Sequence, residues 1–109
     1  MKKNEPHETK DLKVSQVQGF LLYLELERSL SSNTINSYAF DLDEFRLFIE
    51  ELYIKGFEDV HDIHIEKFLA QLKKEYKASS TARLLSSLRQ FYEYLIDTKS
   101  FNIKLNPLE

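Results

Sequence analysis

Residues 78–95, ASSTARLLSSLRQFYEYL, decide the fold of this 109-residue chain, because they carry two helical patterns at once. An apolar stripe recurs at spacings of three and four residues and consists of Leu85, Leu88, Tyr92 and Leu95. A second face has the same rhythm and carries no carboxylate; its members are Ser79, Arg83, Ser86, Ser87 and Gln90. We therefore predict a long helix that packs in a core and turns a polar face to a partner. Hydroxyl, amide and guanidinium donors suit phosphate oxygens and base edges.

Three upstream segments also have the apolar periodicity of amphipathic helices. The expected helices cover residues 14–28, 34–54 and 62–76. Their apolar positions are Val14, Val17, Leu21 and Leu24 in the first, Ile35, Tyr38, Leu42, Phe45, Phe48, Ile49 and Leu52 in the second, and Ile65, Phe68, Leu69 and Leu72 in the third. No segment shows a convincing strand pattern. The sequence therefore predicts an all-α fold, a four-helix bundle with short loops.

Short polar side chains and one glycine mark the expected helix ends. The expected N-terminal caps are one of Ser31, Ser32 and Asn33 for the second helix, Asp62 for the third, and Ser79 or Ser80 for the fourth. Gly56 is expected to stop the second helix, and the fourth is expected to end near Thr98. We expect residues 1–11 to be a mobile arm, residues 12–100 to form one helical domain, and residues 101–109 to be an extended tail.

Composition narrows the class of protein. The chain has no cysteine, so it has neither a disulfide framework nor a thiolate metal site. No apolar run approaches membrane-spanning length and the N-terminus lacks an apolar signal core, so we expect a cytoplasmic protein without a membrane partner. The net charge is −3, yet positive charge gathers at the start of the last helix, where Lys77, Arg83 and Arg89 precede the acidic residues.

No constellation of residues favours an enzyme or a cofactor site. His61 and His64 are three residues apart, but a metal site needs three or four converging ligands, so we interpret them as part of a solvated helix start. No serine lies in a G-x-S-x-G turn, and Gly19 and Gly56 stand alone, so no phosphate loop exists. We assign most aromatic residues to the core. Tyr76, beside Lys77, is the one candidate for base stacking.

Two polar helix starts remain, residues 33–37 (NTINS) and 79–83 (SSTAR). The N-terminus of a helix offers free N–H groups and the positive end of its dipole to anions such as phosphate. Simple capping accounts equally well for Ser32, Asn33, Ser79 and Ser80. It accounts less well for Asn36, Ser37, Arg83 and Ser87, which lie beyond the cap positions, where glutamate and lysine are the usual exposed residues.

Both starts belong to longer motifs. Residues 30–45, LSSNTINSYAFDLDEF, resemble the L-S-x-x-T-x-x-x-Y-x-x-D-L segment of tyrosine recombinases, and residues 80–95, STARLLSSLRQFYEYL, resemble their S-x-x-R-x-L-S-x-L-R-x-F-Y-x-Y-L segment. The likeness to the Xer recombinases and phage integrases covers residues 12–109. Asn106-Pro107 looks like the junction that precedes the family's catalytic domain.

The resemblance implies a core-binding domain with a four-helix SAM-like fold, which forms one half of a clamp around duplex DNA at a recombination half-site. Its second and fourth helices would face the DNA major groove. The matching positions expected to contact DNA are Thr34, Asn36, Ser37, Lys77, Ser79, Ser80, Arg83 and Ser87, with Arg89 either supporting the fold or reaching a phosphate. The matching positions expected to be structural are Tyr38, Asp41, Leu42, Leu85, Leu88, Phe91 and Tyr92.

The chain departs from the family pattern near Tyr38, where many relatives carry an arginine and this chain has Asn36, Ser37, Ala39 and Phe40. The second helix is acidic further along, so we expect low DNA affinity from the isolated domain. The family's nucleophilic tyrosine and its Arg/Lys/His set belong to a second domain, so we expect no catalytic residue and no cofactor here.

The parent protein would be a recombinase acting with further subunits on DNA, in either chromosome-dimer resolution or mobile-element integration, whereas this domain alone is expected to be a monomer. An alternative remains open, a helical protein-interaction module without DNA binding. Its working surface would be the acidic second and third helices.

Overall fold

The computed structural model describes residues 5–98 and 106–108. Within them the chain forms four α-helices and no strand: α1 (Glu5–Leu26), α2 (Ser32–Glu51), α3 (Asp62–Glu75) and α4 (Ala78–Asp97). A short 3₁₀ helix, η1 (Phe57–Asp59), lies in the loop between α2 and α3. The all-α, four-helix prediction is confirmed, and in the part of the chain that the structure describes, η1 was not predicted from the sequence.

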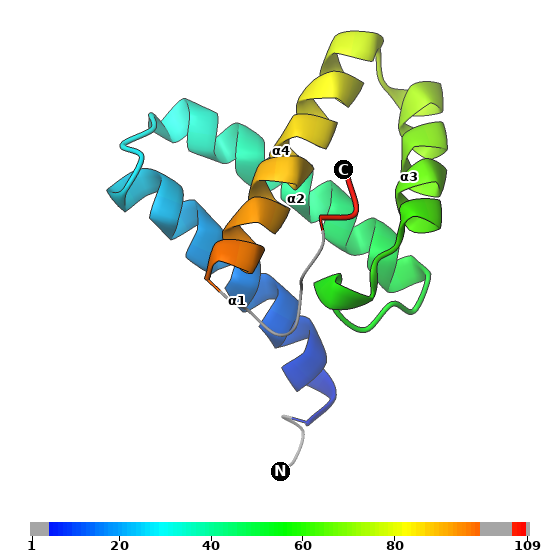
Figure 1. Cartoon of the computed structure of the whole chain (residues 1–109), viewed down its shortest axis with the longest axis horizontal. Helices are drawn as coiled ribbons and strands as arrows, with labels where there is room; N and C mark the ends of the chain where they lie inside the picture. The colour runs from blue at the N-terminus through cyan, green and yellow to red at the C-terminus, as the bar shows by residue number, and fades with distance from the viewer. Residues whose placement is uncertain (1–4, 99–105, 109) are drawn as a thin grey trace.

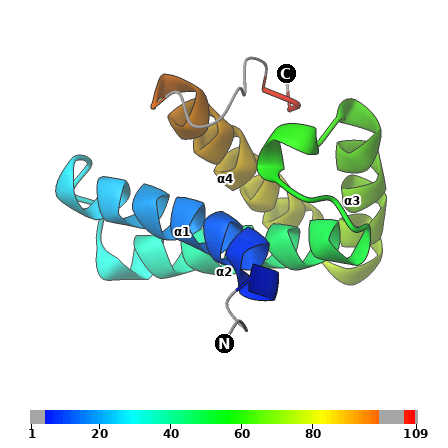
Figure 2. The same cartoon turned by 90° about the horizontal axis from the view of Figure 1, so that it is seen from below.

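The helices pack around α2 and α4. The helices α1 and α2 lie side by side and run in opposite directions (Figure 2). The helix α4 crosses both of them and lies against α3, which also contacts α2 (Figure 1). The crossing of α2 and α4 brings together the two helices that the sequence motifs occupy.

Aromatic side chains from every helical segment meet in the core. Phe20 of α1 makes an edge-on contact with Phe91 of α4 at a centroid distance of 5.4 Å, and Phe45 of α2 contacts Phe68 of α3 at 5.2 Å. Most of the apolar residues of the core are almost fully buried: Phe20, Leu24, Leu42, Phe45, Phe48, Ile49, Ile54, Phe57, Val60, Phe68, Leu72, Leu84, Leu88, Phe91, Tyr92 and Leu95. The assignment of the aromatic residues to the core is therefore confirmed.

Three residues of the predicted apolar stripe of α4, Leu88, Tyr92 and Leu95, are buried, and the fourth, Leu85, is not. Leu84 is fully buried, whereas Leu85 is only half-buried and lines a shallow groove with Ile65 of α3 and Leu108. The prediction that Leu85 belongs to the buried stripe of this helix was therefore wrong. Positions 84, 88, 91, 92 and 95 make the inner stripe, and the polar side chains of Thr81 and Ser87 are buried beside it.

Three of the predicted helix starts differ from the structure. The helix α1 begins at Glu5 rather than at residue 14, so residues 5–11 of the expected arm are helical and residues 1–4 lie outside the described residues. His61, not Asp62, is the N-cap of α3, and Lys77, not Ser79 or Ser80, is the N-cap of α4. Ser31 does cap α2, since its hydroxyl accepts a hydrogen bond from the Thr34 N–H at 3.3 Å.

The end of α2 does not use the predicted glycine. The helix stops at Glu51, and Tyr53 adopts the left-handed conformation with φ of 59°. The Tyr53 N–H donates to the Glu50 carbonyl at 3.0 Å and the Ile54 N–H donates to the Ile49 carbonyl at 3.0 Å, the two bonds of a Schellman motif. Gly56 lies three residues after Tyr53, so the expectation that it stops α2 was wrong.

The last described residues lie against α4. The side-chain amide of Asn106 donates to the Arg89 carbonyl at 3.1 Å, and its oxygen accepts the Leu108 N–H at 3.0 Å. Leu108 packs on the core cluster. Most of the expected tail, residues 101–105 and 109, lies outside the described residues.

Candidate nucleic-acid interface

The two polar motifs meet at a buried carboxylate. Asp41 of α2 has no exposed surface, and both of its oxygens accept hydrogen bonds from α4. Arg83 donates from Nη2 to Oδ1 at 2.6 Å and from Nε to Oδ2 at 3.1 Å, and the Ser87 hydroxyl donates to Oδ2 at 2.7 Å. This arrangement satisfies a buried charge, which would otherwise be costly.

This cluster changes the interpretation of the polar face of α4. Ser87 is buried and directed to Asp41, so it cannot reach a partner in this structure. The donors that would suit a phosphate instead hold an internal carboxylate. Asp41 has the structural role expected of it, and its hydrogen bond and charge raise the pKa of Arg83 above its ordinary value.

The start of α4 remains accessible around this cluster. Lys77 and Ser79 are exposed, Ser80 is half-buried, and the side chain of Arg83 is 48% exposed. Lys77 makes no side-chain cap hydrogen bond to the first turn. The amides of that turn therefore receive no side-chain cap from Lys77, which is exposed to solvent.

The α2 residues of the first motif divide between two faces. Thr34 and Ser37 are exposed and lie seven and four residues before Asp41, so the helical repeat places them on the side of α2 that carries Asp41. Asn36 is also exposed but lies well around the helix from that line. We define the α2–α4 face as Thr34, Ser37, Ser79, Ser80 and Arg83.

Arg89 lies away from the α2–α4 face. It is exposed and lines the groove between α3 and α4 with Asp62 and Glu66, and its carbonyl accepts the Asn106 amide. Two acidic neighbours make this groove a poor phosphate site. The contact with Asn106 uses the backbone of Arg89, so the two roles expected of its side chain, supporting the fold or reaching a phosphate, stay predictions.

Two further sequence candidates have internal partners. The Tyr76 hydroxyl donates to Glu44 Oε1 at 3.2 Å, so this half-buried ring is tied to α2 and is poorly placed for base stacking. The His61 N–H donates to His64 Nδ1 at 2.9 Å at the start of α3. The described residues contain no group of three or more His, Cys, Asp or Glu side chains that could hold a metal ion.

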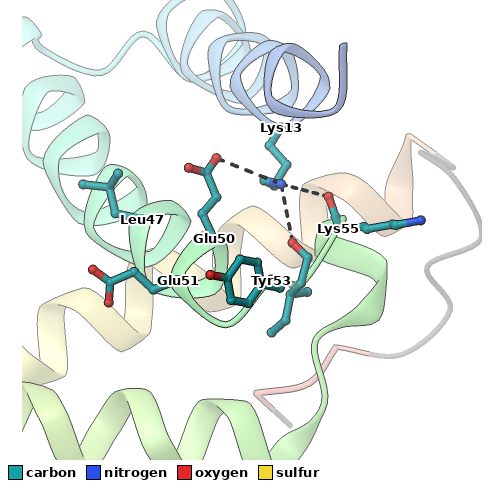
Figure 3. Close-up of a pocket in the computed structure, with 7 residues that line it drawn as sticks. Lys13, Leu47, Glu50, Glu51, Tyr53 and Lys55 are labelled. Atoms are coloured by element: carbon teal, nitrogen blue, oxygen red, sulfur yellow. Dashed lines mark hydrogen bonds and ion pairs between the residues drawn. The ribbon is translucent and has the colours of Figure 1, made fainter. Parts of the chain in front are cut away.

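One buried residue, a lysine, was not predicted from the sequence. Lys13 of α1 is 3% exposed, and its Nζ donates to the Lys55 carbonyl at 2.8 Å and to the Ile54 carbonyl at 3.5 Å (Figure 3). Glu50 lies 4.0 Å from the same nitrogen. The available signal was the helical spacing of Lys13 with Phe20 and Leu24, which places all three on the core side of α1.

Comparison with known proteins supports the motif assignments. The family described as phage integrase, N-terminal SAM-like domain, matches residues 17–99. A protein named tyrosine recombinase XerC from Halalkalibacterium halodurans is 40% identical over 84 residues, which cover 76% of this chain and 28% of that protein. Proteins of the same name from Lacticaseibacillus casei and Herpetosiphon aurantiacus are 40% identical over 97 and 95 residues.

The matched region is a minor part of these relatives. The chain spans less than a third of their length, between 28% and 31% for the three named here. No solved structure gives a significant match. Among the described residues, no helix is both long enough and apolar enough to cross a membrane.

Proposed function

Because this chain belongs to the phage integrase N-terminal SAM-like family, we propose that it is the DNA-binding module of a site-specific tyrosine recombinase. The module would contact duplex DNA through the α2–α4 face and Lys77, and would form one side of a clamp at a recombination half-site. Cutting and rejoining of strands would belong to other parts of the protein, acting with further recombinase subunits.

The accessible start of α4 is the observation that carries this proposal. Lys77 and Ser79 are exposed there, Ser80 is half-buried, and the side chain of Arg83, which is bonded to Asp41, is 48% exposed. Lysine and serine side chains and helix N-termini contact phosphate in protein–DNA complexes, and an arginine also recognises base edges. The names of the XerC relatives add the recombinase context, because those proteins are named for that activity.

A titration followed by NMR tests the proposal. A mixed-sequence 20-base-pair duplex, added at low salt, should shift the amides of residues 77–83 and 34–37 and leave those of α3 unmoved. Because few cations line the surface, the log–log salt slope should be shallow, on the order of −2 to −4.

Two single-alanine variants sharpen this test. Arg83→Ala should weaken binding by about 1–3 kcal/mol. Lys67→Ala is the matched control, because Lys67 is an exposed cation on α3, away from the α2–α4 face, and its loss should have little effect. Equal losses in the two variants would mean that binding is diffuse and does not use the α2–α4 face.

One observation favours the alternative, a protein-interaction module. Tyr53 is 92% exposed and lies with Leu47, which is 47% exposed, at an open apolar pocket (Figure 3). A chain that shows no amide shifts with duplex DNA at low salt would favour that function instead.

A further inference from the structure

The pairing with Asp41 determines which N–H donors of Arg83 remain free. A guanidinium has five N–H groups, and the Nε and Nη2 edge is committed to the carboxylate. The structure gives Nη1 no hydrogen bond to any described residue, and the side chain is 48% exposed. The edge formed by Nη1 and the second Nη2 hydrogen is therefore the part of Arg83 left for a ligand.

The orientation of this free edge is fixed. Two hydrogen bonds to the Asp41 carboxylate hold the guanidinium plane of Arg83. The carboxylate is held in place in turn, because it is fully buried and also accepts a hydrogen bond from the Ser87 hydroxyl. A two-point contact of this kind presents paired donors in one direction. An exposed arginine without such an anchor would be free to rotate.

The same pairing offsets the charge of Arg83. Asp41 lies 2.6 Å from Nη2, so the pair presents directional donors with little net charge. Affinity for the phosphate backbone depends on unpaired positive charge, whereas a base edge is recognised by the positions of donors and acceptors. The geometry therefore suits base recognition better than phosphate neutralisation.

We propose that Asp41 is a positioning residue that fixes the free edge of Arg83 for recognition of the O6 and N7 atoms of guanine in duplex DNA. This inference rests on the proposed DNA-binding function. It adds a specificity-determining role for a pair of residues that would otherwise be only a buried ion pair.

Removal of one acceptor atom from the DNA tests the inference. The probes are a G·C-rich 20-base-pair duplex and the same duplex with 7-deazaguanine at every guanine, which removes N7 and leaves the phosphates unchanged. The wild-type chain should bind the 7-deaza duplex about fivefold or more weakly, while Arg83→Ala should bind the two duplexes equally. Equal wild-type binding to both duplexes, with salt dependence intact, would overturn the inference and leave DNA binding standing. Failure to bind either duplex would overturn both.

An Asp41→Asn variant separates positioning from a purely structural role. The variant should lose the discrimination between the two duplexes, while its salt slope should become steeper by about 1, because Arg83 becomes an unpaired cation. A folded Asp41→Asn chain that keeps the discrimination would contradict the inference.

A measurement on the wild-type chain avoids any dependence on the folding of that variant. The Nε–H signal of Arg83 should stay protected in the free chain and in the complex with the G·C-rich duplex, while its Nη signals shift on binding. Loss of the Nε–H protection on binding would mean that Arg83 leaves Asp41 to reach DNA, and would overturn the inference.

Discussion

At the residue scale, Leu84 and Leu85 are neighbours in sequence with different surroundings. Leu84 is fully buried in the core, and Leu85 is half-buried at the groove beside Leu108. Leu84→Ala should lower the free energy of unfolding by about 2–5 kcal/mol, because it leaves a cavity in a packed core. Leu85→Ala should cost about 1 kcal/mol or less, because the groove is open to water. Urea denaturation of both variants measures the difference, and equal losses would contradict the assigned helix face.

Tyr92 makes the free energy of unfolding depend on pH in the alkaline range. Burial raises the pKa of its hydroxyl well above the ordinary value of 10.0, and the charges of Glu58 and Asp59 act in the same direction. The unfolded chain releases this proton near pH 10 while the folded chain keeps it. Tyr92 therefore contributes stability below pH 10 that is lost as the pH rises further.

Tyr92→Phe should show this link in thermal denaturation at pH 7 and above pH 10. The variant loses the hydrogen bond to the Phe57 carbonyl, which measures 2.6 Å, so its stability at pH 7 should fall by about 1–3 kcal/mol. Its further loss above pH 10 should be smaller than that of the wild type. Tyr53→Phe is the matched control, because Tyr53 is 92% exposed and its hydroxyl should contribute little at pH 7. An alkaline loss in Tyr92→Phe as large as in the wild type would contradict the assignment.

The sequence predicted individual core residues better than it predicted polar contacts. The aromatic residues were found from their size and spacing. Ser87 was placed on the outer face because a serine carries no sign of burial, and its acceptor, Asp41, lies 46 residues away. The first motif contained Asp41 and the second contained Arg83 and Ser87. Their contact became visible only in the structure, where α2 and α4 cross.

At the element scale, helix interiors were predictable and helix ends were not. Apolar periodicity placed all four helices, because burial repeats along their length. The end of α2 was missed because the left-handed position is filled by Tyr53, where glycine is the usual residue. The start of α1 was missed because residues 5–11, EPHETKD, contain no apolar residue that continues the pattern, and because the buried position 13 is filled by a lysine.

Lys13 joins two elements and should therefore matter for stability. Its Nζ holds the carbonyls that follow α2, so Lys13→Ala removes hydrogen bonds and buried aliphatic contact between α1 and that turn. The free energy of unfolding should fall by about 1–3 kcal/mol, measured by urea denaturation. Lys55→Ala is the matched control, since Lys55 contributes only its carbonyl to this contact and the variant keeps it. A loss in Lys55→Ala as large as in Lys13→Ala would show that the contact through Nζ is unimportant.

At the scale of the whole molecule, the distribution of the tyrosines argues against strand cleavage by this chain alone. Five of the six are packed on other residues: Tyr23, Tyr38, Tyr76, Tyr92 and Tyr94. Tyr53 is the exposed one, and its neighbours at the pocket include Glu50 and Glu51 as well as Lys13 and Lys55. A nucleophilic tyrosine needs help in losing its proton and donors that stabilise charge on the phosphate.

This chain should therefore form no covalent adduct with DNA. The experiment incubates it with a nicked duplex that traps cleavage products, at a salt concentration where binding is measurable, and separates the products on a denaturing gel. No band that contains both protein and DNA should appear, because the carboxylates of Glu50 and Glu51 at the pocket repel a phosphate. One of the two lysines that line the pocket, Lys13, is already bound to two carbonyls. An adduct that resists denaturation in the wild type and disappears in Tyr53→Phe would contradict this prediction and would assign a catalytic residue to the pocket of Figure 3.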